Sequence, residues 1–256
     1  MKSNLLRIIY NKRSMLVILF LFLLTIFDFS MHLIADKVMY TELGIKYHPA
    51  FASFLSNTTE GHIWQKLMLW FLPIYMLLIC SDHYINDVAT GYNHILIGKI
   101  GKQRYIRNLM LEAFIFPMVI MFIILIINYI LNLWFYHGGT DFAGLQGFKG
   151  FWFELSLYRP NLTYVIFVIC TSLLTGVCGL LCSCCSLIFP DYKYAYPLSF
   201  IIWFFGISVD YSIAFLTQPF AEFGFDWLMP IWGAVIGIII ILTVSVYIYK
   251  VNTDEI

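Results

Sequence analysis

Charged residues are scarce in this sequence. Asp, Glu, Lys and Arg make up 12% of its 256 residues, whereas roughly 25% is usual for a soluble domain. The 15 basic and 15 acidic residues balance, so no basic excess favours a nucleic-acid partner. Hydrophobic residues reach 61%, and the mean hydropathy is +0.83. The chain therefore lacks the polar surface of a water-soluble globule, and its composition predicts an integral membrane protein.

Motifs for catalysis and nucleotide binding are also missing. The sequence contains neither a His-Glu-x-x-His zinc pair nor a Gly-x-Ser-x-Gly nucleophile turn. Its nearest approach to a phosphate-binding loop is Gly91 followed by Gly98-Lys99, which has the wrong spacing. In addition, Ile100 stands where a Ser or Thr would bind magnesium. The chain is therefore not expected to be an enzyme by itself, to hydrolyse ATP or to hold a cofactor.

Metal sites and disulfides are not indicated either. All six cysteines lie in apolar stretches, which is typical of small buried thiols. His83 and His94 would share one face of a continuous helix. A metal-dependent intramembrane enzyme therefore stays open as an alternative, although we favour the absence of a metal.

Six apolar stretches are long enough to span a bilayer, because a hydrocarbon core of ~30 Å needs about 20 helical residues. They are Met15–Ala35, Ile63–Cys80, Leu109–Trp134, Leu162–Phe189, Ala195–Leu216 and Trp227–Tyr249. Helices are expected because each backbone polar group in lipid must be satisfied within its own segment, and the alternation of a membrane barrel is missing. We predict an all-α, polytopic fold with about six transmembrane helices, forming a single membrane domain over residues 1–256.

The distribution of Lys and Arg predicts the orientation, because cytoplasmic loops are enriched in both. A cytoplasmic N-terminus places ten of the 15 basic residues inside, which are Lys2, Arg7, Lys12, Arg13, Lys99, Lys102, Arg104, Arg107, Lys193 and Lys250. Both termini are therefore expected in the cytoplasm, with the protein in the cell membrane. The first dozen residues suit a short helix in the membrane interface, or an ordinary positive flank of the first span.

The segment between the second and third spans carries the clearest functional pattern. It contains acidic residues, a turn glycine, a short apolar stretch, a second turn and a basic run, in that order. These residues are Asp82 and Asp87, Gly91, Ile95 and Ile97, Gly98 and Gly101, and Arg104, Tyr105 and Arg107. The pattern predicts a short amphipathic cytoplasmic helix held against the membrane and suited to docking on a soluble partner.

This pattern resembles the cytoplasmic signature of the type-2 ABC exporter permeases. In that family an acid-rich exit from the second helix precedes a Gly-x-hydrophobic segment, a small turn and a basic run around a tyrosine. Asp87, Gly91 and the Arg104-Tyr105 pair match in order, and the helix count and inside termini fit nearly the whole chain.

The resemblance implies a half-channel. Two such permeases pair, as a homodimer or with a paralogous subunit, and each docks a separate ATPase, which binds ATP and magnesium, through residues 82–108. The implied cargo is amphipathic or peptide-like, antimicrobial peptides included, and is exported across a bacterial membrane among its lipids. Two departures bear on the docking helix: Asn86 replaces an acid often found there, and Lys99-Ile-Gly-Lys replaces a proline-containing turn. A non-transporting scaffold or immunity subunit is an alternative.

Ionisable residues within the apolar stretches suggest a translocation path. Asp28, His32 and Asp210 fall toward the outer side in the predicted orientation, and such groups usually face an interior or a water-filled cavity. We expect them either to line an outward vestibule or to make local hydrogen bonds at the headgroup boundary.

The fourth apolar stretch carries small residues at helical spacing. These residues are Ser172, Gly176, Gly179 and Ser183. Because small side chains let helix backbones approach closely in lipid, they predict a packing face against another helix, in this subunit or across a dimer.

Overall fold

The structure is a computed structural model in which helices dominate. It describes residues 7–43, 46–56, 63–142, 151–210, 212–220 and 225–253. Within these ranges there is no β-strand, and Tyr47 and Asp141 form an isolated bridge. The predicted all-α fold class is confirmed for this part of the chain.

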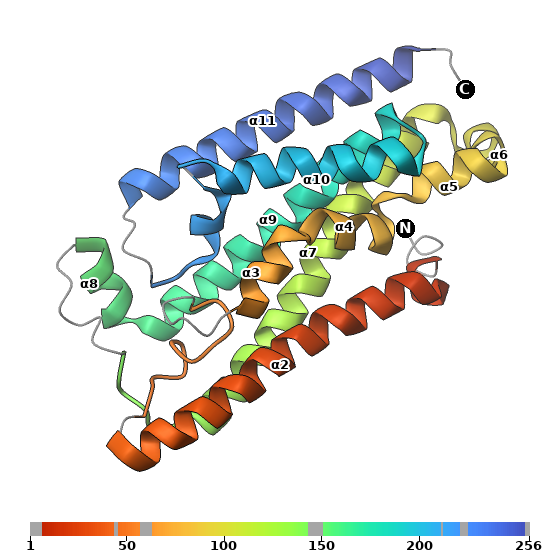
Figure 1. Cartoon of the computed structure of the whole chain (residues 1–256). Helices are drawn as coiled ribbons and strands as arrows, with labels where there is room; N and C mark the ends of the chain where they lie inside the picture. The colour runs from red at the N-terminus through yellow and green to blue at the C-terminus, as the bar shows by residue number, and fades with distance from the viewer. Residues whose placement is uncertain are drawn as a thin grey trace.

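The helices follow one another along the chain as shown in Figure 1. They are α2 (Lys12–Leu43), α3 (Ile63–Trp70), α4 (Leu72–Met76), the π-helix η1 (Leu77–Ser81), α5 (His83–Thr90), α6 (Tyr92–Ile100), α7 (Lys102–Phe135), α8 (Phe151–Tyr158), α9 (Pro160–Ile188), α10 (Tyr192–Ser208), the 3₁₀-helix η3 (Ile213–Thr217) and α11 (Phe225–Asn252). Residues 7–10, ahead of α2, are also helical, and residues 1–6 of the predicted interfacial helix lie outside the described residues.

Four of the described helices are long and apolar enough to cross a membrane. They are α7, α9, residues Lys12–Ile34 of α2 and residues Trp227–Asn252 of α11. A fifth candidate is the pair Ile63–Trp70 and Leu72–Ser81, which is bent by 62° at a short break. These lengths and compositions indicate a membrane protein.

The predicted span Ala195–Leu216 is not one continuous helix, which corrects the sequence interpretation. Helix α10 ends at Ser208 after 17 residues, so it rises only about 25 Å. The chain then leaves the helix, and Ser212 starts η3 by accepting a hydrogen bond from the backbone N–H of Ala214 at 3.1 Å. Ser208, Asp210 and Ser212 are the sequence signal at this interruption, which the length of the apolar stretch obscured.

The bend in the second predicted span has a local cause. Proline has no N–H group, so Pro73 cannot donate to the carbonyl of Leu69 one helical turn earlier. Instead, the indole N–H of Trp203 in α10 donates to that carbonyl at 2.8 Å. The broken helix is thus stabilised by a neighbour, as an apolar interior requires.

Helix α9 forms the centre of the bundle and packs against α7, α10 and α11. In the most apolar 18-residue stretch of α9, 67% is buried inside the bundle, compared with 17% in the corresponding stretch of α11. Its small-residue face allows a close approach to α7. A Cβ atom at Gly176 would lie 2.8 Å from the carbonyl oxygen of Phe114, and one at Gly179 would collide with the carbonyl of Ala113. Ser172 and Ser183 are buried in the same helix.

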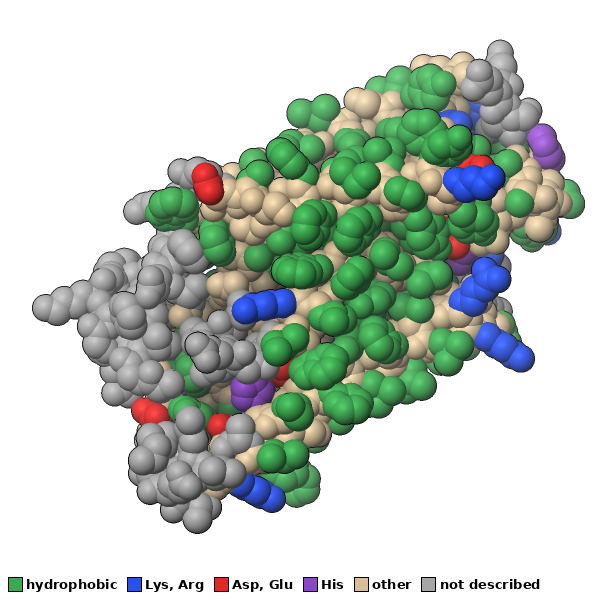
Figure 2. Space-filling model, viewed as in Figure 1, with side chains coloured by type: hydrophobic (Ala, Val, Ile, Leu, Met, Phe, Trp, Pro, Cys, Tyr) green, Lys and Arg blue, Asp and Glu red, His purple; other side chains and the backbone are tan. Residues whose placement is uncertain are grey.

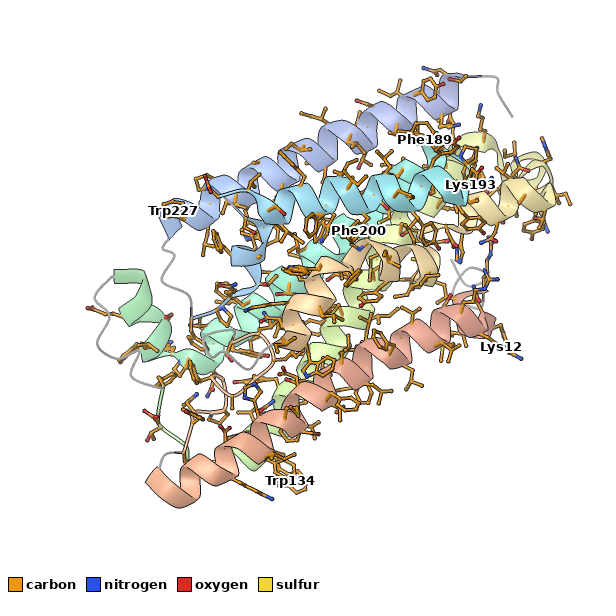
Figure 3. The ribbon with its side chains drawn as sticks, viewed as in Figure 1. Lys12, Trp134, Phe189, Lys193, Phe200 and Trp227 are labelled. Carbon is orange, nitrogen blue, oxygen red and sulfur yellow. The ribbon has the colours of Figure 1, made fainter. Side chains whose placement is uncertain are left out.

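Charged and hydrophobic side chains occupy different parts of the length of the bundle. Hydrophobic side chains cover the middle of the face shown in Figure 2, and Lys and Arg lie mainly toward its ends. Lys12 and Lys193 lie at one end and Trp227 at the other (Figure 3). Helices α5 and α6 are at the same end as the start of α2 and the end of α11 (Figure 1).

Candidate functional site

The segment with the family-like pattern forms a hairpin of two short helices. Helix α5 ends at Thr90 and is followed by Gly91, whose φ of 70° suits glycine, and α6 starts directly after it. Two expectations are corrected here. The predicted turn from Gly98 to Gly101 is confined to Gly101, with φ 83°, because Gly98 lies inside α6. The basic run lies within α7, which begins at Lys102 and not at the predicted Leu109.

The two histidines of the hairpin do not share a helix face. His83 is buried in α5, and His94 is exposed in α6, beyond the turn at Gly91. The continuous helix that would have aligned them is therefore absent. Among the described residues, no group of three His, Cys, Asp or Glu is placed to hold a metal ion.

The hairpin starts from the π-helix η1. A π-helix shifts the hydrogen-bond register, so the backbone N–H of Asp82 donates to the carbonyl of Leu77 at 3.3 Å. Serine hydroxyls from neighbouring helices donate to other carbonyls of this turn. Ser14 of α2 donates to Ile79 at 2.8 Å, and Ser186 of α9 donates to Ser81 at 2.8 Å. The π-turn is therefore fixed between α2 and α9.

Asp87 is the centre of the hairpin's polar contacts and is only 1% exposed. The Tyr105 hydroxyl donates to its Oδ2 at 2.7 Å. The Arg7 guanidinium donates to both carboxylate oxygens, at 2.6 Å to Oδ1 and 3.2 Å to Oδ2. Such charge-assisted, bidentate bonds are strong. Asp87 therefore joins α5 to the N-terminal segment and to α7.

A second set of bonds joins α5 to α10. The Tyr196 hydroxyl donates to Asp82 Oδ2 at 3.3 Å, and the Tyr192 hydroxyl donates to Asn86 Oδ1 at 2.6 Å. Burial raises the pKa of Asp82 above its ordinary value, although His83 and the Tyr196 hydrogen bond act in the opposite direction. Asp82 thus lies in a partly desolvated position that disfavours its charged form.

His83 and Glu112 form a third buried pair. Nδ1 of His83 lies 3.9 Å from Oε2 of Glu112, and both side chains are almost fully buried. No described side chain or backbone group makes a hydrogen bond to either ring nitrogen of His83. We define the polar cluster as Arg7, Asp82, His83, Asp87, Tyr105 and Glu112.

The outer face of the hairpin has different chemistry. Ile95 is 64% exposed and Lys99 of α6 is also exposed, as are Arg104 and Arg107 in the adjoining first turns of α7. Ile97 is half-buried and packs against the hydrophobic cluster beneath the hairpin. The predicted docking residues thus fall into two groups. Asp82, Asp87 and Tyr105 anchor the hairpin from inside, and Ile95 and Arg104 face outward.

The proposed translocation residues are not brought together in one described cavity. Asp28 is buried in α2, His32 is half-buried in the same helix, and Asp210 is exposed just after α10. Helices α2 and α10 lie on different flanks of the bundle (Figure 1). Next to Asp28, Asn128 of α7 donates to the carbonyl of Thr25 at 3.1 Å. Asp210 therefore lies apart from Asp28 and His32, which are one turn apart in α2.

Sequence reasoning missed that Arg7 and Glu112 belong to this site. Arg7 lies 80 positions from Asp87, and no local pattern pairs them. A signal was nevertheless present, because Asp87 and Glu112 border apolar segments and need partners when they are buried.

The fold and the polar cluster define an all-α protein with apolar helices of membrane-spanning length. At one end it carries a helical hairpin held by side-chain hydrogen bonds and an ion pair. The chain is 38% identical to YybM of Bacillus subtilis (strain 168), an uncharacterized protein, over 258 residues that cover 100% of both chains. It therefore belongs to the same family as YybM. No family model and no solved structure matches the chain.

Proposed function

We propose that this protein is the membrane-spanning permease subunit of a type-2 ABC exporter. In this proposal the chain crosses the cell membrane six times with both termini in the cytoplasm. The bent helix Ile63–Ser81 and helix α10 then supply the second and fifth spans. A separate ATPase supplies the energy, and a second copy or a similar permease completes the channel.

The observation that carries this proposal is the hairpin α5–α6. It presents the exposed Ile95 and Lys99 on its outer face, and the exposed Arg104 and Arg107 follow it in the first turns of α7. Its inner face is fixed by the bidentate Arg7–Asp87 pair and the Tyr105 hydrogen bond. A docking element that transmits force needs both an accessible surface and rigid attachments.

The attachments of the hairpin suggest how force would reach the spans. Asp87 links α5 to the segment before α2 and to α7, and Asp82 links it to α10. A displacement of α6 by a nucleotide-driven partner would therefore act on several helices at once. We infer that the polar cluster acts as the coupling joint and that the exported cargo is amphipathic or peptide-like.

Co-purification tests this proposal. The intact chain and an Arg104→Glu variant are purified from the native membrane in mild detergent, with Arg159→Glu as the matched control. Arg159 is also exposed, but it lies next to α8, at the opposite end of the bundle (Figure 1). We expect a soluble ATPase to accompany the intact chain and the control and to be lost from Arg104→Glu. If no ATPase accompanies the intact chain, the proposal fails.

A further inference from the structure

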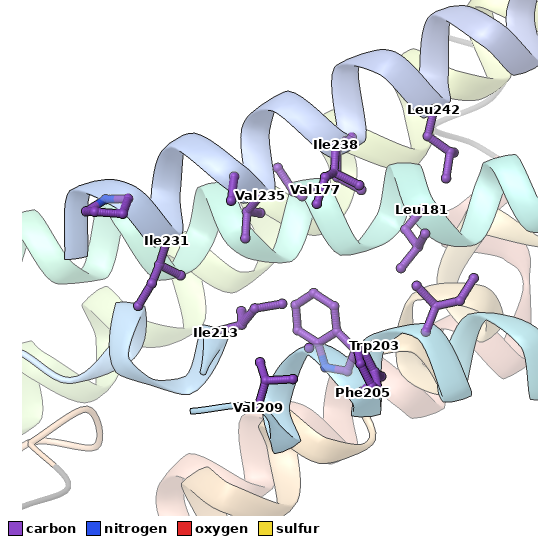
Figure 4. A pocket seen from close by; sticks show the side chains of 15 residues that line it. Val177, Leu181, Trp203, Phe205, Val209, Ile213, Ile231, Val235, Ile238 and Leu242 are labelled. Carbon is purple, nitrogen blue, oxygen red and sulfur yellow. The ribbon is translucent and has the colours of Figure 1, made fainter. Parts of the chain in front are cut away.

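An apolar cleft runs between α9, α10 and α11, away from the polar cluster (Figure 4). Its volume is about 520 Å³. Val177 and Leu181 of α9 lie on one side, Trp203 of α10 and Val209, which directly follows α10, lie on another, and α11 forms the third. None of the lining side chains is charged.

Water is not a suitable occupant of the cleft. A buried water needs two to four polar partners, and the one indole N–H in the lining, that of Trp203, already donates to the carbonyl of Leu69. An empty cleft would leave its lining atoms without van der Waals contacts. The lining therefore suits a hydrocarbon.

The cleft opens to the outside of the bundle. Ile238 of α11 lines it and yet is 63% exposed, and Phe205 of α10 is 71% exposed. In a bilayer this opening faces lipid tails, because α11 is one of the helices of spanning length. Acyl chains can therefore enter sideways, without crossing the polar ends of the protein.

The length of the cleft matches one leaflet. Helix α11 lines it from Pro230 to Leu242, which is about 18 Å at the helical rise. Half of a hydrocarbon core is about 15 Å thick. Trp227, which is exposed, lies just before Pro230 in α11, and tryptophan is enriched at the membrane interface. The cleft thus starts near headgroup level and runs toward the middle of the membrane.

The width of the cleft suits slender hydrocarbon chains better than a whole helix. Spread over its length, the volume gives a mean cross-section of about 30 Å². A helix about 10 Å wide needs about 80 Å². A hydrocarbon chain whose carbons lie about 4 Å from their neighbours needs about 15 Å². The cleft therefore suits acyl chains better than a whole helix of a second copy.

We propose that the α9–α10–α11 cleft binds one acyl chain of a membrane phospholipid, in the leaflet at the N-terminal end of α11. The bound chain fills the space between α10 and α11, each of which packs against α9. This inference does not depend on an ATPase partner and requires only that the chain resides in a bilayer.

Photo-crosslinking tests the proposal. The full-length protein is reconstituted into vesicles of phosphatidylethanolamine and phosphatidylglycerol that contain a phosphatidylethanolamine with a diazirine on its acyl chain. Adducts are then mapped by mass spectrometry. We expect adducts on Leu181 and Val177, which are nearly buried behind the cleft mouth. An Ala234→Trp variant, which fills the cleft, should lower these adducts about tenfold, corresponding to ~1.4 kcal/mol.

The matched variants use two isoleucines of α11. Ile238 lines the cleft, and Ile241 does not, although their exposures are similar, at 63% and 68%. Ile238→Trp should lower the Leu181 adducts as Ala234→Trp does, and Ile241→Trp should leave them unchanged. If either cleft-filling variant does not fold, the other decides the test. Adducts confined to exposed positions such as Ile241, or Leu181 adducts that persist in the folded cleft-filling variant, would overturn the proposal. Cysteine cross-links between two copies at position 238 would overturn it as well.

Discussion

The contact between Arg7 and Asp87 provides a quantitative test of the polar cluster. In an Arg7→Met variant, Asp87 stays buried at 1% exposure with the Tyr105 hydroxyl as its remaining side-chain partner. Removing one partner of a buried ion pair costs about 3–5 kcal/mol. Because the Arg7 side chain is 33% exposed, solvent weakens the pair. We therefore expect a loss of about 3 kcal/mol, at the lower end of the range.

A Tyr105→Phe variant removes a different partner of the same carboxylate. It deletes one hydrogen bond to a charged group, which is worth about 1.5–3 kcal/mol. The Arg7 guanidinium then still satisfies both oxygens of Asp87, so the loss should be smaller than for Arg7→Met. The double variant should be more than additive, because its second change leaves Asp87 without a charged or hydroxyl partner.

The measurement is the free energy of unfolding in mixed detergent micelles, by denaturant titration with far-UV circular dichroism. Lys12→Met is the matched control, because Lys12 is exposed at the start of α2, and it should change stability by less than about 0.5 kcal/mol. Adding Asp87→Asn to Arg7→Met should restore stability, since a neutral amide can still accept the Tyr105 hydrogen bond. If Asp87→Asn gives no restoration, or if Arg7→Met matches Lys12→Met, the buried ion pair is refuted.

Three further predictions concern other parts of the chain. Gly179→Ala should destabilise the protein by at least ~2 kcal/mol in the same titration, because the new methyl group meets the backbone of α7. The control is Gly233→Ala, which has open space around it and should be neutral or stabilising by up to about 1 kcal/mol. Trp203→Phe should cost about 1–3 kcal/mol, because the carbonyl of Leu69 loses its donor, and equal stability would contradict the role given to this bond. Burial raises the pKa of Asp82 above its ordinary 3.8, so its destabilising effect is absent below that pH and fully present above the raised pKa. Asp82→Asn should therefore raise the melting temperature at pH 7 by an amount that shrinks as the pH falls toward about 4, and a pH-independent difference would refute this assignment.

The sequence was sufficient for features that depend on composition and local spacing. Long apolar runs require helices in lipid, because backbone N–H and C=O groups there must form hydrogen bonds within their own segment. Gly176 and Gly179 indicated a close helix contact, because a residue without a side chain lets any neighbouring helix approach its backbone closely. Gly91 indicated a turn, because a positive φ suits glycine.

The tertiary structure decided which distant groups meet. Arg7 and Asp87 form an ion pair although they lie 80 positions apart in the sequence. Trp203 donates a hydrogen bond to the carbonyl of Leu69, which Pro73 leaves without a backbone donor. The separation of Asp28 from Asp210 also follows from packing. Hydropathy measures how apolar a segment is, and it does not record which neighbour supplies its hydrogen bonds. The sequence therefore determined the helical, membrane-spanning character of this protein, and only the packing of its helices determined the polar cluster and the acyl-sized cleft.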